Sequence, residues 1–350
     1  MATVTARTTT TVTRRGMLAS GWTKAGGVVL CVGLLLVVAF CSLAFGSRPI
    51  QLSTVRDALF SFDGTDDQLI VRTLRGPRTI VGLMVGGALG LAGAVMQGVT
   101  RNPLADPGLL GIEGGAALAV VLSIRLLDIT SVGAHVWFAL AGAAVGCAVV
   151  YTIGSLGRGG ATPVKLALAG AALSSLFFAF IWAVLLLDVT TLDRFRFWLA
   201  GSIAGRDGDV ATSVAPFLAV GAVLALGSAR SLNTLALGED VARSLGARIG
   251  LTRTVAIVAV ALLCGGATAA AGPVAFVGLT VPHIARAICG PDYRWILPWC
   301  LVLAPSLVLG ADVIGRLVAR PGELEVGVVM ALIGAPAFIA LVRRRKLASL

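Results

Sequence analysis

Residues 79–100 read TIVGLMVGGALGLAGAVMQGVT, a run without a single Asp, Glu, Lys or Arg. A helix needs about 20 mostly apolar residues to cross the hydrocarbon core of a bilayer, and this run has that length. Small side chains recur in it at every fourth position, at Gly82, Gly86, Gly90, Ala94 and Gly98. Such a ladder lets a second helix approach closely. The run therefore predicts a transmembrane helix packed inside a helical bundle.

Similar runs fill most of the chain. Hydrophobic residues make up 57% of the 350 residues and charged residues 13%, and the mean hydropathy is +0.95. This composition is typical of a polytopic membrane protein. The apolar runs are residues 25–47, 79–100, 107–124, 129–157, 166–187, 210–229, 254–285, 295–311 and 326–342. Because the run 254–285 is long for one span and contains Gly272-Pro273, we divide it there. The sequence thus predicts an all-α fold with ten transmembrane helices. Residues 1–24 are predicted to form a disordered tail, and residues 25–350 a single membrane domain.

The basic residues indicate how the chain is oriented. With ten spans both termini lie on one side, and most of the 28 Lys and Arg fall on that side, including all three lysines, Lys24, Lys165 and Lys346. Basic loops stay in the cytoplasm, so we expect cytoplasmic termini. The net charge of +11 then reflects orientation and gives no reason to expect nucleic-acid binding. Arg14-Arg15 also resembles a twin-arginine export signal, but a basic flank before a first span is the simpler interpretation.

Cysteine, histidine and nucleotide-binding patterns predict no site for a metal or a cofactor. The six cysteines form no Cys-x-x-Cys pair, and His135 and His283 are the only histidines. The Gly-x-x-x-x-Gly-Lys-Ser/Thr phosphate loop is also absent from the sequence. We therefore expect that any ATP chemistry comes from a partner.

The segment SLNTLALGEDVARSLGARIG, residues 231–250, differs from the apolar runs around it. Gly238 divides it, and the second half places Glu239 and Asp240 first and Arg243 near its end, which is the charge order that a helix dipole favours. Apolar residues recur in it every four positions and line one side, at Leu237, Val241, Leu245 and Ile249. A solvated loop is the simplest interpretation, and a short amphipathic helix that docks a partner is the alternative.

Three carboxylates in or near the apolar runs leave two other functions as alternatives, a proton-coupled carrier and an intramembrane enzyme. A proton-coupled carrier would need titratable groups such as Glu113, Asp188 or Asp312 on its path. Each of them lies near the end of a run, where we expect the membrane interface to solvate it, so the carrier is the less favoured alternative. An intramembrane enzyme would need a catalytic constellation. His283 is the one tempting base, but it follows a proline near a helix end, where a structural or docking role is favoured.

Several long motifs resemble one family. The string RGPRTIVGLMVGGALGLAGAVMQGVTRNPLADPGLLGIEGGAAL, residues 75–118, is similar to the permeases of ABC importers for iron-siderophores, haem and cobalamin, the FecCD type. Four further strings follow in family order: FWLAGSIAG (197–205), LNTLALGEDVARSLGA (232–247), GPVAFVGLTVPHIAR (272–286) and ADVIGRLVARPGELEVGVVMALIGAP (311–336). The resemblance covers nearly everything from residue 70 onward.

This resemblance implies a type II ABC importer permease fold in the cytoplasmic membrane of a bacterium, with ten spans and cytoplasmic termini. A second permease subunit, identical or different, would pair with this chain around a central path. Two ABC ATPase subunits would bind ATP and magnesium below, and an extracytoplasmic substrate-binding protein would dock above. ATPase closure would move the docking helices and rock the permease pair between two states.

Family positions also imply roles for particular residues. The helices that seat in the ATPase correspond to Leu232, Asn233, Leu235, Leu237, Gly238, Glu239, Asp240, Arg243, Leu245 and Gly246. The arginines that meet glutamates of the binding protein correspond to Arg75, Arg78 and Arg316, and with a weaker match to Arg72 and Arg320. The cytoplasmic gate corresponds to Thr162 and Pro163, where Pro163 replaces the small polar residue of better-known members.

The substrate is implied by the resemblance alone. TRNPLADPGLLG and the ending ARPGELEVGVV with RRRK are most similar to ferric-siderophore permeases, especially those of the ferric-enterobactin kind that take catecholate chelates. Haem and cobalamin importers of the same family stay open as alternatives.

Overall fold

The computed structural model describes residues 16–18, 20–156 and 162–343, and all regular elements in this part of the chain are helical. In the first half the helices are α1 (Gly21–Ala44), α2 (Leu52–Phe60), α3 (Asp66–Leu69), the π-helical η1 (Ile70–Arg75), α4 (Gly76–Thr100), the 3-10 helix η2 (Pro107–Leu110), α5 (Ile112–Leu127) and α6 (Val132–Ser155). In the second half they are α7 (Pro163–Leu187), α8 (Val189–Leu199), α9 (Gly208–Gly227), α10 (Ala229–Ala236), α11 (Glu239–Ser244), α12 (Ile249–Ala271), α13 (Val277–Cys289), α14 (Tyr293–Val318) and α15 (Val326–Arg343).

Seven of these helical stretches are long and apolar enough to cross a membrane: α1, α3 to α4, α6, α7, α9, α12 and α14. The other three predicted spans coincide with the shorter helices α5, α13 and α15. In the described part of the chain these have 16, 13 and 18 residues. The division at Gly272-Pro273 holds. α12 ends at Ala271, Gly272 has φ 74°, and α13 begins only at Val277.

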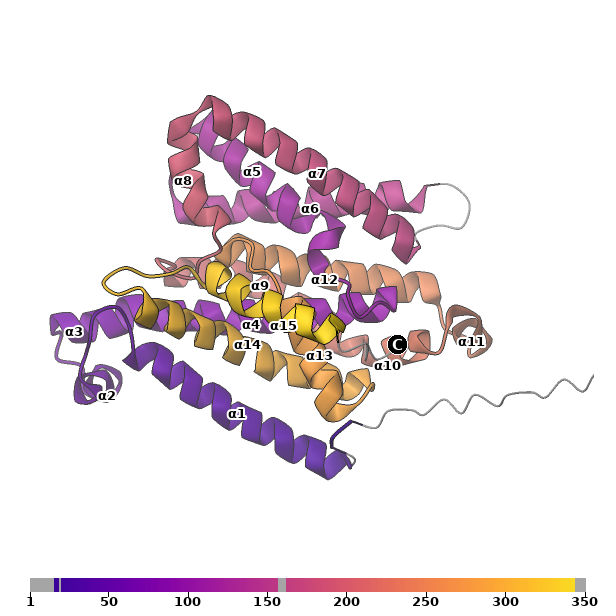
Figure 1. Cartoon of the computed structure of the whole chain (residues 1–350), viewed down its shortest axis with the longest axis horizontal. Helices are drawn as coiled ribbons and strands as arrows, with labels where there is room; N and C mark the ends of the chain where they lie inside the picture. The colour runs from indigo at the N-terminus through magenta and orange to yellow at the C-terminus, as the bar shows by residue number, and fades with distance from the viewer. Residues whose placement is uncertain (1–15, 19, 157–161, 344–350) are drawn as a thin grey trace, which may run out of the picture.

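The small-residue ladder places α4 at the centre of the bundle. A Cβ on Gly86 would lie 2.5 Å from Pro305 Cα of α14, and one on Gly90 would lie 2.6 Å from Ala304 Cβ. The two backbones are therefore in contact, and α4 also packs against α9, α12 and α13. In Figure 1, helices α5 to α8 form a second layer beside this central group, and α1 lies along the opposite side.

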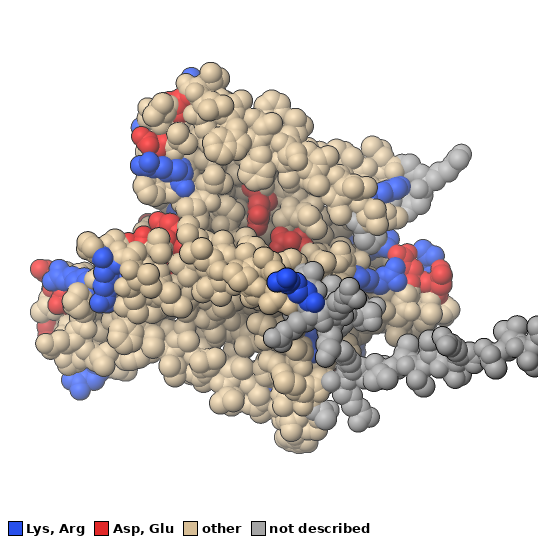
Figure 2. All heavy atoms as spheres, viewed as in Figure 1, with Lys and Arg blue, Asp and Glu red and all other residues tan. Residues whose placement is uncertain are grey.

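The charged side chains gather at the two ends of the bundle. Figure 2 shows most of the blue and red atoms toward the left and right ends, and the mostly tan region between them carries only a few red and blue groups. Helices α2, α3 and the loop from α14 to α15 lie at one end, which we call the arginine end. The opposite end of the bundle, which we call the α11 end, contains α10 and α11. The first residue of α1 and the last described residue of α15 also lie there.

Residues near the start of the chain are held by the bundle. The backbone N–H of Met17 donates to the carbonyl oxygen of Ala287, and that of Leu18 to Ile288, both near the end of α13. Ser20 then caps α1, so the first span begins four residues before the predicted Ala25. Residues 1–15 and 19 of the predicted disordered tail lie outside the described residues.

Candidate functional site

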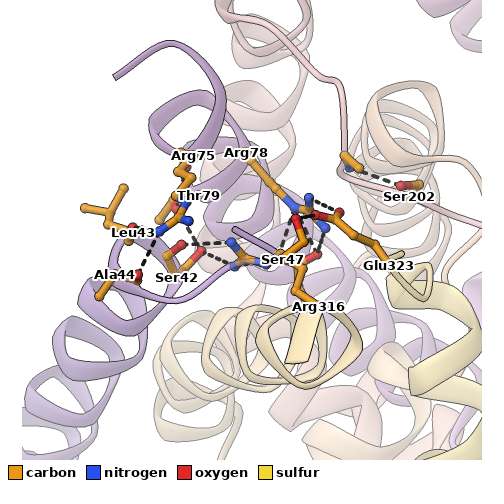
Figure 3. Close-up of polar contacts among 12 residues, drawn as sticks. Ser42, Leu43, Ala44, Ser47, Arg75, Arg78, Thr79, Ser202, Arg316 and Glu323 are labelled. Carbon is orange, nitrogen blue, oxygen red and sulfur yellow. Dashed lines mark hydrogen bonds and ion pairs between the residues drawn. The ribbon is translucent and has the colours of Figure 1, made fainter. Parts of the chain in front are cut away.

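At the arginine end, Arg75 turns inward. Its Nη1 donates to the carbonyl oxygens of Leu43 and Ala44, at 2.9 and 2.7 Å, and its Nη2 donates to that of Arg48, at 2.6 Å. These carbonyls belong to the last turn of α1 and to the loop after it, where helical partners run out. Arg75 therefore ties the end of α1 to the start of α4, and only 5% of it is exposed (Figure 3).

Asp312 of α14 links two further arginines. Its carboxylate lies 2.7 Å from Nη2 of Arg78 and 2.9 Å from Nη2 of Arg316, and it is fully buried. Arg316 also donates to the carbonyl and hydroxyl oxygens of Ser42 in α1, both at 3.0 Å. One carboxylate and two guanidinium groups thus join α1, α4 and α14. Buried charges are tolerated in this way when they are paired and hydrogen-bonded.

Glu323 extends this network to the loop before α15. Its carboxylate accepts hydrogen bonds from Arg78 Nη1 at 2.6 Å and from the hydroxyl of Ser47 at 2.9 Å (Figure 3). Partial burial works against the charged form, yet the bonds from Arg78 and Ser47 and the charge of Arg316 hold the pKa of Glu323 below its usual value. Glu323 is therefore ionised at neutral pH.

The arginines that the resemblance assigns to a binding protein are thus already occupied. Arg75, Arg78 and Arg316 are each at most 8% exposed. The weaker candidates also bond inside the chain, since Arg72 donates to the carbonyl of Ala58 and Arg320 to that of Gly46. A contact of these side chains with a partner stays a prediction, and it would require an existing bond to open.

The three carboxylates that a proton-coupled carrier would use have different surroundings. The expectation that the membrane interface solvates Asp312 is wrong, because two guanidinium groups replace water there. Asp188 caps α8 and accepts a 2.6 Å hydrogen bond from the hydroxyl of Thr191. Glu113 is half-buried in the first turn of α5 and makes no hydrogen bond or ion pair with the residues that the structure describes.

At the α11 end, α10 is anchored to the bundle. Leu232 and Leu235 are buried. The Asn233 side chain donates to the Asp292 carboxylate at 2.6 Å and accepts from the backbone N–H of Tyr293 at 2.8 Å, where α14 begins. This side of α10 therefore holds the helix against α14, and a contact of Leu232, Asn233 or Leu235 with an ATPase stays a prediction.

Glu239 anchors α11 in a similar way. Its carboxylate lies 2.5 Å from Arg253 Nη2 of α12, 3.4 Å from Arg243 Nη2 and 3.8 Å from Arg101 Nη2, just after α4. Its neighbour Asp240 has a fully exposed side chain. Of the two acidic residues that begin α11, the first thus points inward and the second points to solvent.

An apolar strip remains free on the outside of α11. Leu237, Val241 and Leu245 are 60%, 47% and 64% exposed. Gly238 and Gly246 flank the helix with φ of 103° and 79°, which glycine adopts without strain. The four apolar residues predicted to line one side of this segment therefore do not share one face. Leu237, Val241 and Leu245 are exposed, whereas Ile249 begins α12 and is buried.

The predicted gate is only partly within the described residues. Thr162 caps α7, and its side chain accepts a hydrogen bond from the backbone N–H of Lys165 at 3.4 Å. Pro163 is the first residue of α7. Residues 157–161, directly before the pair, lie outside the described part of the chain.

The ring of His283, the candidate base, lies within hydrogen-bonding distance of a backbone carbonyl. His283 Nε2 lies 3.1 Å from the carbonyl oxygen of Pro103, so the ring connects α13 to the loop after α4. Within residues 16–18, 20–156 and 162–343, no group of three His, Cys, Asp or Glu side chains could hold a metal ion.

Two arginines in these clusters were not predicted from the sequence. Arg253 donates a hydrogen bond to Glu239, which lies 14 residues earlier in the chain. This separation does not match the three- or four-residue spacing of ion pairs within a helix. Arg206 directly follows the family-like string FWLAGSIAG and lines a cavity at the arginine end. The adjoining string was the only available signal for Arg206.

Comparison with known proteins agrees with this architecture. Residues 34–344 match the model of the FecCD transport family. The chain is 41% identical over 318 residues to the probable siderophore transport system permease protein YfiZ of Bacillus subtilis, covering 91% of this chain and 96% of YfiZ. It is 45% identical over 313 residues to the ferric enterobactin transport system permease protein FepD of Escherichia coli, covering 89% and 93%.

A solved structure is similar over nearly the same length. It is described as an inward-facing conformation of a putative metal-chelate type ABC transporter, with a TM-score of 0.80 and 26% identity over 91% of this chain and 99% of that one. The family match spans most of the sequence and agrees with the motifs that resemble these permeases. The chain belongs to the FecCD transport family.

Proposed function

We propose that this chain is the permease subunit of an ABC importer that moves a ferric-siderophore across the cytoplasmic membrane of a bacterium. The observation that carries the proposal is the anchored and partly exposed α10–α11 segment at one end of an apolar bundle, in a member of the FecCD family. The names of YfiZ and FepD, a siderophore and a ferric enterobactin permease, support this substrate class.

In this proposal ten helices cross the membrane. They are α1, α4, α5, α6, α7, α9, α12, α13, α14 and α15, with the α11 end in the cytoplasm. The arrangement of the chain supports this topology, because α1 begins and α15 ends at the α11 end (Figure 1). The basic residues of the sequence favour the same orientation.

The α11 end is then the docking surface for an ATPase subunit. Leu237, Val241 and Leu245 seat in the ATPase, while Asn233 and Glu239 hold the two short helices to α14 and α12. The permease itself carries no catalytic residue, and ATP and magnesium bind to the two partner ATPases. A rigidly held apolar strip transmits motion better than a loose one.

The remaining partners complete the importer. A second permease subunit forms the central path with this chain, as a homodimer or a heterodimer. A substrate-binding protein docks at the arginine end and delivers the chelate. Thr162 and Pro163, at the start of α7, form part of the cytoplasmic gate. Alternating access follows from ATPase closure, which rocks the pair of permeases.

The test is reconstitution in liposomes with the partner ATPase and substrate-binding protein, followed by uptake of a radioactive ferric-catecholate chelate. Leu245→Ser should lower both ATPase copurification and ATP-dependent uptake, since it removes an exposed apolar contact. The matched control is Leu126→Ser, which changes a 70% exposed leucine at the other end of the bundle, near α8. Its uptake should stay at the wild-type level.

Two results would overturn the proposal. Uptake that follows a proton gradient without ATP would identify a secondary carrier, and Glu113, Asp188 and Asp312 would become the residues to neutralise. Competition in the same liposomes tests the substrate. Preferred uptake of haem or cobalamin over the ferric chelate would contradict the proposed substrate but not the importer function.

A further inference from the structure

An open pocket of about 440 Å³ lies at the α11 end, between the end of α9, the start of α10 and the start of α14. Arg230 and Arg294 line it, and no acidic residue of the described chain does. Leu226, Leu297 and Pro298 contribute apolar walls. Basic groups above an apolar wall, at the end of helices long enough to cross a membrane, are the combination that binds a lipid headgroup.

The two arginines differ in what they can offer a ligand. Arg294 donates from Nε and Nη2 to the Asp292 carboxylate, at 3.0 and 2.9 Å, so that this carboxylate balances its charge. Arg230 is exposed, and its side chain makes no hydrogen bond or ion pair with the residues that the structure describes. The pocket therefore carries the uncompensated charge of Arg230, and the start of α14 adds the partial positive charge of a helix dipole.

A second hollow, of about 250 Å³, lies between α4, α9, α12 and α14, and its described lining consists of apolar side chains and glycine. Ala215, Ala219 and Ala222 line it from α9, at the spacing of one helix face. Gly87 and Ala88 line it from α4. Because these side chains are small, they leave an apolar groove between the long helices.

The pocket and the groove follow one another along the same two helices. Leu226 and Leu297 line the pocket, and Ala222 and Leu301, each four residues away, line the groove. Four residues advance a helix by roughly 6 Å. From Ala215 to Leu226 the two hollows together extend roughly 16 Å at about 1.5 Å per residue. This length is close to one leaflet, which is half of a hydrocarbon core about 30 Å thick.

We propose that the pocket and groove bind one anionic glycerophospholipid of the cytoplasmic leaflet, with its phosphate at Arg230 and an acyl chain against α4. A guanidinium group donates two parallel hydrogen bonds to phosphate oxygens. The groove suits an acyl chain, because its lining offers no polar side chain. A zwitterionic lipid fits less well, since its ammonium group would lie beside two arginines. The inference rests on the membrane orientation in the proposed function, and it is independent of the substrate and the partner proteins.

The test titrates the full-length permease in a neutral detergent with phosphatidylglycerol or phosphatidylcholine and measures bound lipid by native mass spectrometry. Wild type should bind phosphatidylglycerol at least about fivefold more tightly, the contribution of one basic group at a membrane surface. Arg230→Gln should lower the affinity for phosphatidylglycerol by about the same factor. Arg230→Lys should keep most of the affinity, because an ammonium group also binds phosphate. Inorganic phosphate should not displace the lipid, since it leaves the groove empty.

The matched control for charge is Arg248→Gln. Arg248 is also exposed at the α11 end, forms no ion pair within the described chain and lies outside the pocket. Its affinity for phosphatidylglycerol should stay within twofold of wild type. Melting temperatures measured without lipid should be equal for the two glutamine variants, which would show that the loss at Arg230 is not a folding defect.

The groove is tested separately by Ala222→Phe. The added ring would occupy the space of the acyl chain while Arg230 stays in place, so binding of phosphatidylglycerol should weaken severalfold. Val223→Phe is the control, because Val223 is 71% exposed and lines neither hollow. It should bind phosphatidylglycerol like the wild type.

Three outcomes would overturn the inference. Equal affinity of Arg230→Gln and Arg248→Gln for phosphatidylglycerol would remove Arg230 from the site. Displacement of lipid by inorganic phosphate, with normal binding by Ala222→Phe, would identify a site for free phosphate. Unchanged lipid binding with loss of ATPase copurification in Arg230→Gln would assign the pocket to the ATPase. These titrations do not use transport, so a wild type without ATP-dependent uptake would contradict the proposed importer and leave the lipid result intact.

Discussion

The carboxylate of Glu239 lies 2.5 Å from Arg253, and this pair fastens α11 to α12. Arg101 and Arg243 approach the same carboxylate from the end of α4 and from α11 itself. One acidic side chain therefore fixes the orientation of the short helix whose outer face carries the exposed leucines. In the proposed importer, Glu239 positions the docking surface, and the exposed apolar residues make the contact with the ATPase.

Glu239→Gln should separate binding of the ATPase from transport. The apolar strip remains, so ATPase copurification should persist, but the helix loses its charged anchor and uptake should fall severalfold. Uptake and copurification measured in the same preparation check this. Asp240→Asn, at the exposed neighbouring acid, is the control and should leave the ratio of uptake to bound ATPase unchanged. Partial recovery of uptake in the double variant Glu239→Arg with Arg253→Glu would support the ion pair. An equal loss of uptake in Glu239→Gln and Asp240→Asn would contradict its role.

Asp312→Asn should destabilise the permease strongly. It leaves Arg78 and Arg316 buried without their shared counter-charge, and breaking a buried pair typically costs about 3–5 kcal/mol. Thermal unfolding in detergent should show a clear decrease in melting temperature. Asp193→Asn is the control, since its pair with Arg196 is exposed at the surface and should contribute less than about 1 kcal/mol. Equal melting temperatures for the two variants would show that the buried network does not stabilise the fold.

Gly86→Ala should disturb the packing of α4 on α14. Its new methyl group would lie 2.5 Å from Pro305 Cα, a backbone atom that cannot rotate away. Overpacking of this kind costs about 1–3 kcal/mol. Gly310→Ala adds the same methyl group in α14 with no atom within 4 Å, so its stability should match or exceed that of the wild type. Thermal unfolding of the two variants gives the comparison, and indistinguishable values would contradict the close helix contact.

The bond between Arg78 and Glu323 should make stability depend on acid pH. The folded-state pKa of Glu323 lies below its unfolded value, so its contribution is fully present above the ordinary value of about 4.3 and is lost as pH falls through the folded pKa. The melting temperature of wild type should exceed that of Glu323→Gln at pH 7, and the difference should shrink as the pH falls below about 4. Glu325→Gln, two residues away in the same loop, controls for general charge effects. A difference between wild type and Glu323→Gln that is constant with pH would show that the pair does not titrate.

Charge-free runs predicted the positions of the long helices well. The run 79–100 became α4, which begins only three residues earlier, and the run 129–157 contains α6. Helices α2 and α8 were not predicted, because they are short and carry charged residues, so they lack the hydropathy that marks a span.

The surroundings of the arginines could not be predicted from local sequence. Arg78 finds its carboxylate 234 positions away at Asp312, and no spacing rule connects them. Motif resemblance located Arg78 and Arg316 but gave no information on their burial. The inward direction of Glu239 depends in the same way on Arg253, which approaches from the following long helix.

The direct contact of α4 with α14 has a consequence for the timing of events on the two faces. α14 begins where Asn233 holds α10 and carries Asp312 toward its other end, while α4 runs from Arg78 to the neighbourhood of Glu239. Because backbone touches backbone at Gly86 and Pro305, no compressible layer separates the two helices. In the proposed importer α4 and α14 therefore move together as one stiff unit, so that a tilt of α10 caused by ATPase closure passes directly to the arginine end.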